Sequence, residues 1–196
     1  MSEARTGERV RETRETRIAV SVNLDGTGEA TIATGVGFYD HLLSALAHHS
    51  LIDLEMKAVG DIEIDDHHTV EDVALALGGA ISDALGDRTG ITRFGAARVP
   101  MVESLASCAL DLSNRPYAVI DLPFRADRMG ELSTQMVEHA LYSFAQASGA
   151  TLHVEGRGRN DHHLAEAAFK ALARALRMAV APDPRRSGVA STKGSL

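Results

Sequence analysis

Cysteine is nearly absent from this chain of 196 residues, where Cys108 is the only one. One thiol excludes a disulfide within the chain and suits a reducing compartment, so we expect a cytoplasmic protein. Tryptophan is missing and aromatic residues make up 4% of the chain, so alanine, leucine and valine must fill the core. No apolar run approaches the roughly 20 residues of a membrane span, and residues 1–16 lack the apolar centre of a signal peptide.

Basic residues are also fewer than acidic ones. The chain has 20 lysines and arginines against 27 acidic residues, a net charge of -7. This balance argues against a broad nucleic-acid surface, so we expect neither nucleic acid nor a membrane as a partner. At this length the chain forms one large domain or two small fused ones, and it can bury a core without disulfides or metal staples.

Histidine, by contrast, is abundant: there are nine, and most fall in recurring motifs. Residues 66–72 spell D-H-H-T-V-E-D, and residues 161–167 spell D-H-H-L-A-E-A. Both copies open a segment with helical apolar spacing. Positions i and i+4 share a helix face, so the first histidine and the glutamate of each copy point the same way. The second histidine is rotated by about 100° and points elsewhere.

This doubled geometry suits two metal ions that share ligands between the copies. The candidate ligands are His41, His67, His68 and Glu71 from the first half, and His139, His162, His163 and Glu166 from the second. Divided evenly, each ion receives three imidazoles and one carboxylate, a set that favours manganese or iron. The lack of cysteine ligands argues against a structural zinc site.

We predict that His67 and Glu71 bind one ion while His68 serves the other, and that the second copy mirrors this arrangement. The sequence leaves open which of His41 and His139 joins which ion. It also leaves open whether a site forms within one chain or between chains.

Four further residues carry weaker signals. His48 and His49 end a predicted helix, where a cation is favoured, so capping is as good an explanation as ligand binding. His153 alternates within a predicted strand, and Cys108 resembles a small buried hydrophobe. We expect both His153 and Cys108 to be structural.

The predicted elements occur twice in the same order. The first half has strands at 17–24, 29–34, 51–59 and 61–65, with helices at 40–49 and 66–85. The second half has strands at 104–112, 117–122 and 151–155, with helices at 132–147 and 161–180. In each half the first two strands are separated by turn residues and are expected to pair as a hairpin.

This order indicates an internal duplication of roughly 85–90 residues. We expect an α+β fold of two halves, each a small β-sheet with two helices on one face, with the helices packed between the sheets. The expected divisions are a flexible N-terminus at 1–12, a first half at 13–95, a second half at 96–184 and a C-terminal tail at 185–196.

The sequence resembles the imidazoleglycerol-phosphate dehydratase family. The resemblance rests on residues 17–28, 35–43, 64–72, 91–95, 110–117, 137–139, 160–170 and 191–194, which span nearly the whole chain in one order. The doubled H-H-x-x-E motif is its most specific feature. Ala45 and Ser50 depart from the glutamine and glycine that the family often has there, and no metal ligand is affected.

The resemblance implies a lyase of L-histidine biosynthesis that dehydrates imidazole glycerol phosphate to imidazole acetol phosphate. It implies two Mn²⁺ per active site, a homo-oligomer of 24 subunits and sites at subunit contacts. By position, the eight metal ligands carry over unchanged. The implied substrate contacts are Glu15, His49, Arg93, Arg115, Lys170, Thr192 and Lys193, and the implied catalytic residues are Glu15, His67, Glu71, His162 and Glu166. The tail is expected to close over the substrate phosphate.

The chemistry explains why such a site is needed. The reaction removes a weakly acidic carbon-bound proton and a hydroxide, and no carbonyl is present to stabilise a carbanion. A substrate ring held by metals at both nitrogens can become an imidazolate and take that role. Glu15 would move protons, which is typically worth about 10²–10⁴-fold in rate.

Two alternatives remain at this point. A binuclear phosphohydrolase would hold its ions about 3.5–4 Å apart, whereas a bridging imidazole ring needs about 6 Å. A metal-storing or structural assembly would need neither Glu15 nor Lys193.

Overall fold

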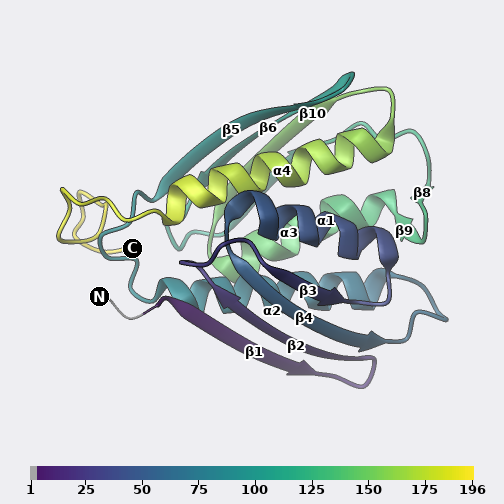
Figure 1. The fold of residues 1–196 in the computed structure, drawn as a ribbon, viewed down its shortest axis with the longest axis horizontal. Helices are drawn as coiled ribbons and strands as arrows, with labels where there is room; N and C mark the ends of the chain where they lie inside the picture. Colours follow the sequence, from purple (N-terminus) through teal and green to yellow (C-terminus); the bar gives the residue numbers. More distant parts are fainter. Residues whose placement is uncertain (1–3) are drawn as a thin grey trace.

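Two four-stranded sheets form the outer layers of the molecule, and four helices fill the space between them (Figure 1). The structure is a computed structural model and describes residues 4–196. The arrangement confirms the expected α+β fold, with two similar halves and the helices enclosed between the sheets. None of these helices is long and apolar enough to cross a membrane.

The first sheet has the strand order β1-β2-β4-β3. Its strands are β1 (Thr6–Glu12), β2 (Thr16–Asn23), β3 (Ala30–Ala33) and β4 (Asp53–Gly60), and its helices are α1 (Gly37–Ser50) and α2 (His67–Leu85). Alternate residues of β2 and β4 are buried, which places one face of the sheet against the helices and the other toward the outside.

The second sheet has the strand order β5-β6-β10-β7. Its strands are β5 (Phe94–Met101), β6 (Ser104–Asp111), β7 (Tyr117–Asp121) and β10 (Thr151–Arg157), and its helices are α3 (Thr134–Ser148) and α4 (Asp161–Val180). A short hairpin of β8 (Arg128–Met129) and β9 (Leu132–Ser133) precedes α3.

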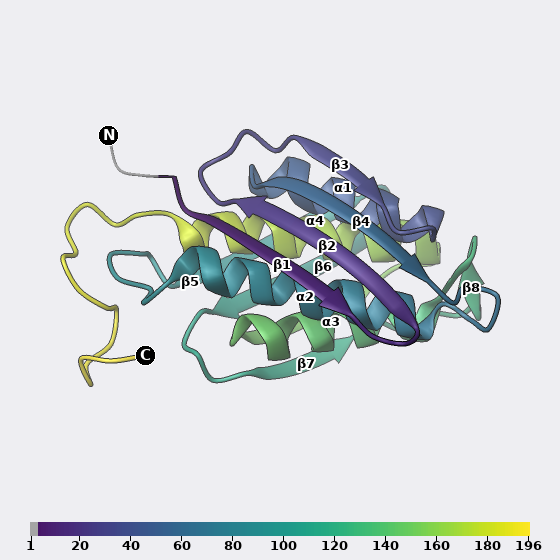
Figure 2. The same cartoon turned by 90° about the horizontal axis from the view of Figure 1, so that it is seen from below.

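The helices of the two halves pack on each other: α2 packs on α3, and α1 packs on α4. The β8–β9 hairpin lies at one end of the molecule, and the chain after α4 projects from the other (Figures 1 and 2). Each D-H-H motif therefore opens its helix at the end nearer the hairpin.

The strand register makes the duplication explicit. Asn23 at the end of β2 pairs with Asp53, as Asp111 at the end of β6 pairs with Thr151. The strands β2 and β6 are equally long, so Thr16 and Ser104 are equivalent positions. Glu15 and Glu103, which immediately precede them, are therefore equivalent as well.

The flexible N-terminus expected at 1–12 begins with three residues that lie outside the described part of the chain. The expectation does not hold for Thr6–Glu12, because β1 pairs along its whole length with β2. The strand escapes detection because it lies at the sheet edge and exposes six of its seven residues, so it shows no apolar alternation. β5 is also an edge strand without clear apolar alternation in its sequence. It begins at Phe94, so the division expected between residues 95 and 96 falls inside a strand.

Both predicted hairpins are wrong. β3 pairs in parallel with β4, and β7 pairs in parallel with β10, so neither strand returns along its predecessor. The actual hairpins join β1 to β2 and β5 to β6. The segment 61–65, predicted as a strand, is a turn before α2. The four predicted helices are present, although α1 begins earlier than expected, at Gly37.

Candidate metal centre and substrate site

Two groups of potential metal ligands form between the helices. His67 and Glu71 of α2 meet His139 of α3 in the first group, and the ligand atoms lie within 4.8 Å of one another. The second group joins His162 and Glu166 of α4 with His41 of α1, within the same limit. Each group thus combines helices from both halves, and this is how His41 and His139 are divided between the groups.

In both groups one carboxylate faces two imidazole nitrogens. The Glu71 oxygens lie 3.4 Å from Nε2 of His67 and 3.5 Å from Nε2 of His139. The Glu166 carboxylate lies 3.3 Å from Nε2 of both His41 and His162.

This donor set fits a divalent first-row ion. Within the described residues, the buried Nε2 atom of His139 has no hydrogen-bond partner, which is unusual for a buried polar atom. A bound cation would satisfy that nitrogen.

The two carboxylates differ in their surroundings. Lys170, one turn further along α4, places its Nζ 2.6 Å from the second oxygen of Glu166. Burial by itself would raise the pKa of Glu166, but hydrogen bonds from Lys170 and His41 bring that pKa below its usual value. Lys170 was expected to contact substrate, and its place beside Glu166 puts it at the ligand group.

The second histidine of each motif belongs to neither group. Its ring is nearly perpendicular to that of the first, at 74° for His67 and His68 and 88° for His162 and His163. Each second histidine instead uses Nδ1 to contact a carboxylate: His68 lies 3.0 Å from Asp61, and His163 lies 2.8 Å from Glu103. A histidine held in this way presents its Nε2 in a fixed direction, as metal ligands commonly do.

The first aspartate of each motif fastens the segment between β7 and α3. The buried Asp66 carboxylate accepts hydrogen bonds from the backbone N–H and the hydroxyl of Ser133. Asp161 accepts from the backbone N–H groups of Arg125 and Ala126. The sequence gives no signal for this role, because the partners lie far away along the chain.

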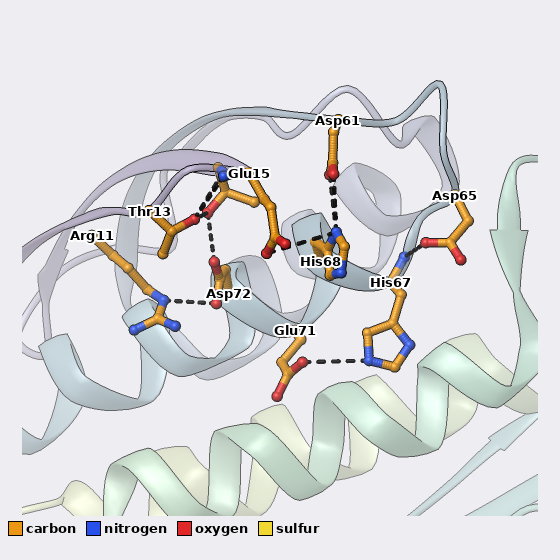
Figure 3. A network of polar contacts seen from close by, with 10 residues as sticks. Arg11, Thr13, Glu15, Asp61, Asp65, His67, His68, Glu71 and Asp72 are labelled. Carbon is orange, nitrogen blue, oxygen red and sulfur yellow. Dashed lines mark hydrogen bonds and ion pairs between the residues drawn. The ribbon is translucent and has the colours of Figure 1, made fainter.

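Glu15 lies at the tip of the β1–β2 hairpin and points toward His68 (Figure 3). Asp72 of α2 fixes the hairpin, because it accepts hydrogen bonds from Arg11 and from the Thr16 hydroxyl. The Glu15 side chain is 52% exposed, and its carboxylate lies 3.9 Å from Nδ1 of His68. It is therefore held near the motif but remains accessible.

A separate cavity of about 520 Å³ lies at the opposite end of α4. Four predicted substrate contacts line it, namely Arg93, Arg115, Thr192 and Lys193. The Arg93 guanidinium donates two hydrogen bonds to Asp111, which raise its pKa, and one to the carbonyl of Ala190. These contacts hold the tail against the second sheet.

The remaining residues with weaker sequence signals belong to neither group. His49 lies in the last turn of α1. Its pKa is lowered by burial and by the charges of Lys170, His48 and Arg174, which outweigh the upward effect of Glu166. Cys108 is buried, which raises its pKa to about 12 and makes an inert thiol, as expected. His153 is exposed on β10, so it is not part of the core.

Comparisons with known proteins agree on one family. The family model described as imidazoleglycerol-phosphate dehydratase matches residues 34–176. An imidazoleglycerol-phosphate dehydratase of Acidiphilium cryptum is 53% identical over 195 residues, covering 98% of this chain and 100% of that protein. The enzyme of that name from Zymomonas mobilis is 54% identical over 188 residues, covering 95% of this chain and 96% of that protein.

Solved structures of the same family match the fold. The crystal structure from Staphylococcus aureus has a TM-score of 0.82 at 31% identity, covering 91% of this chain and 99% of that one. The structure from Pyrococcus furiosus has a TM-score of 0.83 at 34% identity, covering 96% of this chain and 100% of that one.

Proposed function

The chain belongs to the imidazoleglycerol-phosphate dehydratase family, and from that premise we propose how its residues carry out the reaction. The protein is a lyase of L-histidine biosynthesis that dehydrates imidazole glycerol phosphate to imidazole acetol phosphate. The comparisons give no support to a phosphohydrolase. The observation that carries the proposal is the pair of histidine–glutamate groups, each built from both halves of the duplication.

In this proposal each group would hold one manganese ion. His67, Glu71 and His139 would bind the first ion, and His41, His162 and Glu166 would bind the second. His163 would add a ligand to the first ion and His68 a ligand to the second, each from a neighbouring subunit. When bound, the ions supply Lewis acidity that stabilises the anionic form of the substrate's imidazole ring.

Glu15 is the proton-transfer residue. Its carboxylate is held by the hairpin and is accessible, so it can take the proton from the substrate carbon. It can then give that proton to the neighbouring carbon, which has lost its hydroxyl group, as the enol becomes the ketone. A general base must come within hydrogen-bond reach of the proton it removes, which the exposed side chain can do.

The cavity at the far end of α4 binds the phosphate. Arg93 and Arg115 provide guanidinium groups and Lys193 an ammonium group, while Thr192 adds a hydroxyl. The tail closes over the phosphate because it contributes both Thr192 and Lys193. A hydrogen bond from the backbone N–H of Gly90 to the carbonyl of Gly188 already links the tail to the segment between α2 and β5.

The distance between the two regions supports an oligomer. The N–H of Arg93 donates to the carbonyl of Ala179, near the end of α4, whereas Glu166 lies near its start. At 1.5 Å per residue these positions are roughly 20 Å apart, more than the short carbon chain between ring and phosphate can span. Ring and phosphate must then contact different subunits. We propose a 24-subunit cytoplasmic homo-oligomer with its sites at subunit contacts.

The test of this function is an assay of manganese-loaded protein on imidazole glycerol phosphate. Glu15→Gln should lower kcat by about 10²–10⁴-fold, the usual contribution of a general base, while manganese content stays unchanged. The matched control is Glu12→Gln, because Glu12 lies on the same hairpin and forms an exposed ion pair with Arg17. Full activity in Glu15→Gln would refute the proton-transfer role, and release of inorganic phosphate by wild type would favour a hydrolase.

A further inference from the structure

The equivalent glutamates Glu15 and Glu103 have opposite surroundings. The Glu103 carboxylate accepts hydrogen bonds from the Ser104 hydroxyl at 2.9 Å and from the backbone N–H groups of Arg159 and Asn160 at 3.2 and 2.9 Å. Its other oxygen lies 2.8 Å from Nδ1 of His163. Both oxygens of Glu103 are therefore engaged, and its side chain is held in place by four neighbouring groups.

Glu15 makes none of these contacts. Within residues 4–196 its carboxylate accepts no hydrogen bond, and the nearest cationic partner is His68 at 3.9 Å. The Nδ1 atom of His68 is already occupied by Asp61, whose two oxygens lie 3.0 and 3.3 Å away (Figure 3). An imidazole has one Nδ1–H to donate, so Asp61 and Glu15 compete for it.

The position equivalent to Asp61 in the second half carries an arginine, so no carboxylate stands there. Thr16 pairs with Gly60, and its equivalent Ser104 lies next to Gly158, so the residues that follow, Asp61 and Arg159, are equivalent. Arg159 contributes a backbone N–H to Glu103 rather than a carboxylate to His163. In the second half no such carboxylate competes for the histidine, and the hairpin glutamate Glu103 contacts Nδ1 of His163.

We propose that Asp61 is a positioning residue that occupies Nδ1 of His68 and thereby keeps Glu15 free for proton transfer. The proposal rests on the proposed role of Glu15. Without Asp61, the Glu15 carboxylate is expected to accept a hydrogen bond from Nδ1 of His68, in the position that Glu103 takes beside Nδ1 of His163. His68 would keep a carboxylate partner and its orientation, so metal binding would survive while the proton-transfer group would be lost.

The experiment compares wild type with Asp61→Ala. In crystals of the metal-free proteins, the distance from the Glu15 carboxylate to Nδ1 of His68 should fall from 3.9 Å to a charge-assisted hydrogen bond of about 2.8 Å. With manganese, kcat should fall at least about tenfold with little change in KM, because substrate binding is intact. Manganese content per chain should equal that of wild type.

Two further variants and a control sharpen the test. Asp61→Glu keeps a carboxylate and should restore most of the activity. Asp61→Asn keeps the side-chain shape and replaces Asp61→Ala in these measurements if the alanine variant does not fold. Its neutral amide holds the imidazole less strongly than a carboxylate, so an intermediate loss is expected. The matched control is Glu63→Gln, an exposed position in the same turn, which should match wild type.

The outcomes separate this proposal from the proposed function. If Asp61→Ala leaves Glu15 in place, or retains full activity while Glu15→Gln is inactive, the role of Asp61 is wrong. A loss of manganese in Asp61→Ala also overturns it, because Asp61 would then support only the ligand. If Glu15→Gln is fully active, the proposed function of Glu15 fails, whatever the Asp61 crystals show.

Discussion

At the scale of single residues, the two halves have kept the same ligands and changed the side chains around them. Glu71 and Glu166 occupy the same place in the motif, but only Glu166 has a lysine one turn later, since Leu75 stands where Lys170 would be. The helical period predicted that each glutamate shares a face with the first histidine. It could not predict which side chain from another element would face the carboxylate, because that depends on packing.

Asp53 allows a prediction about pH. One oxygen accepts the backbone N–H groups of Thr27, Gly28 and Glu29 at 2.8–3.0 Å. Burial raises the pKa of Asp53, but these bonds outweigh it and the net shift is downward from 3.8. The charged form therefore stabilises the fold above the unfolded pKa, and this stabilisation is lost as pH falls through the lower folded pKa.

We expect Asp53→Ala to cost about 1–2 kcal/mol at pH 7, because three backbone donors lose a charged acceptor. The measurement is the thermal midpoint of wild type and variant at pH 7 and at a series of pH values below 3.8, over which the gap between the two midpoints should shrink as Asp53 becomes protonated. Glu55→Gln, an exposed position on the same strand, should show no difference at any of these pH values. A gap between Asp53→Ala and wild type that persists in acid would contradict the charge argument.

At the scale of elements, the helices were predictable and the strand partners were not. Helical spacing is a local signal, and all four helices were found near their predicted positions. The edge strands β1 and β5 carry no apolar alternation, so the hairpins were assigned to the wrong neighbours. Parallel pairing of β3 with β4 and of β7 with β10 joins segments separated by a helix, which turn residues cannot reveal.

The helix-to-strand packing is repeated in both halves and gives a second prediction. A side chain at Gly95 of β5 would collide with the carbonyl oxygen of Ala175 on α4, as one at Gly7 of β1 would collide with Ala80 on α2. Gly95→Ala should therefore destabilise the protein by about 1–3 kcal/mol, the usual cost of overpacking. It should also weaken manganese binding, because α4 carries His162 and Glu166.

The control for this prediction is another glycine. A side chain at Gly79 within α2 would meet only the flexible side chain of Arg9, whose Nε lies 3.3 Å away. Gly79→Ala should stabilise the protein by up to about 1 kcal/mol, because alanine favours the helix. Thermal midpoints and manganese titrations of both variants provide the test. Equal stability of Gly95→Ala and wild type would show that the helix can shift without cost.

At the scale of the whole molecule, α2 and α4 begin at one end and carry the candidate ligand groups there, whereas the tail that lines the cavity lies at the other end (Figure 1). The resemblance implied sites at subunit contacts, and the separation of the two regions is the physical reason to expect them. If Glu15 and Lys193 contact the same small substrate, as proposed, they must come from different chains.

Mixed oligomers test this arrangement. Glu15→Gln and Lys193→Ala should each be nearly inactive as pure proteins. Co-expressed in equal amounts they should regain activity, because about a quarter of the sites would combine intact copies of both residues from different subunits. Native mass spectrometry would verify the mixing. A mixed assembly as inactive as its parents would place both residues of a site in the same chain. The control is a chain that carries both substitutions and is expressed alone, which should stay inactive.

The family, the helices and the faces on which the motif histidines and glutamates lie could be predicted from the amino-acid sequence, because they follow from local period and residue identity. The grouping of His139 with His67 and of His41 with His162 follows instead from the packing of helices from different halves. Packing also places Glu103 in contact with His163 and leaves the Glu15 side chain exposed. These differences depend on contacts between residues that are far apart in the chain, and a local sequence pattern carries no information about such contacts.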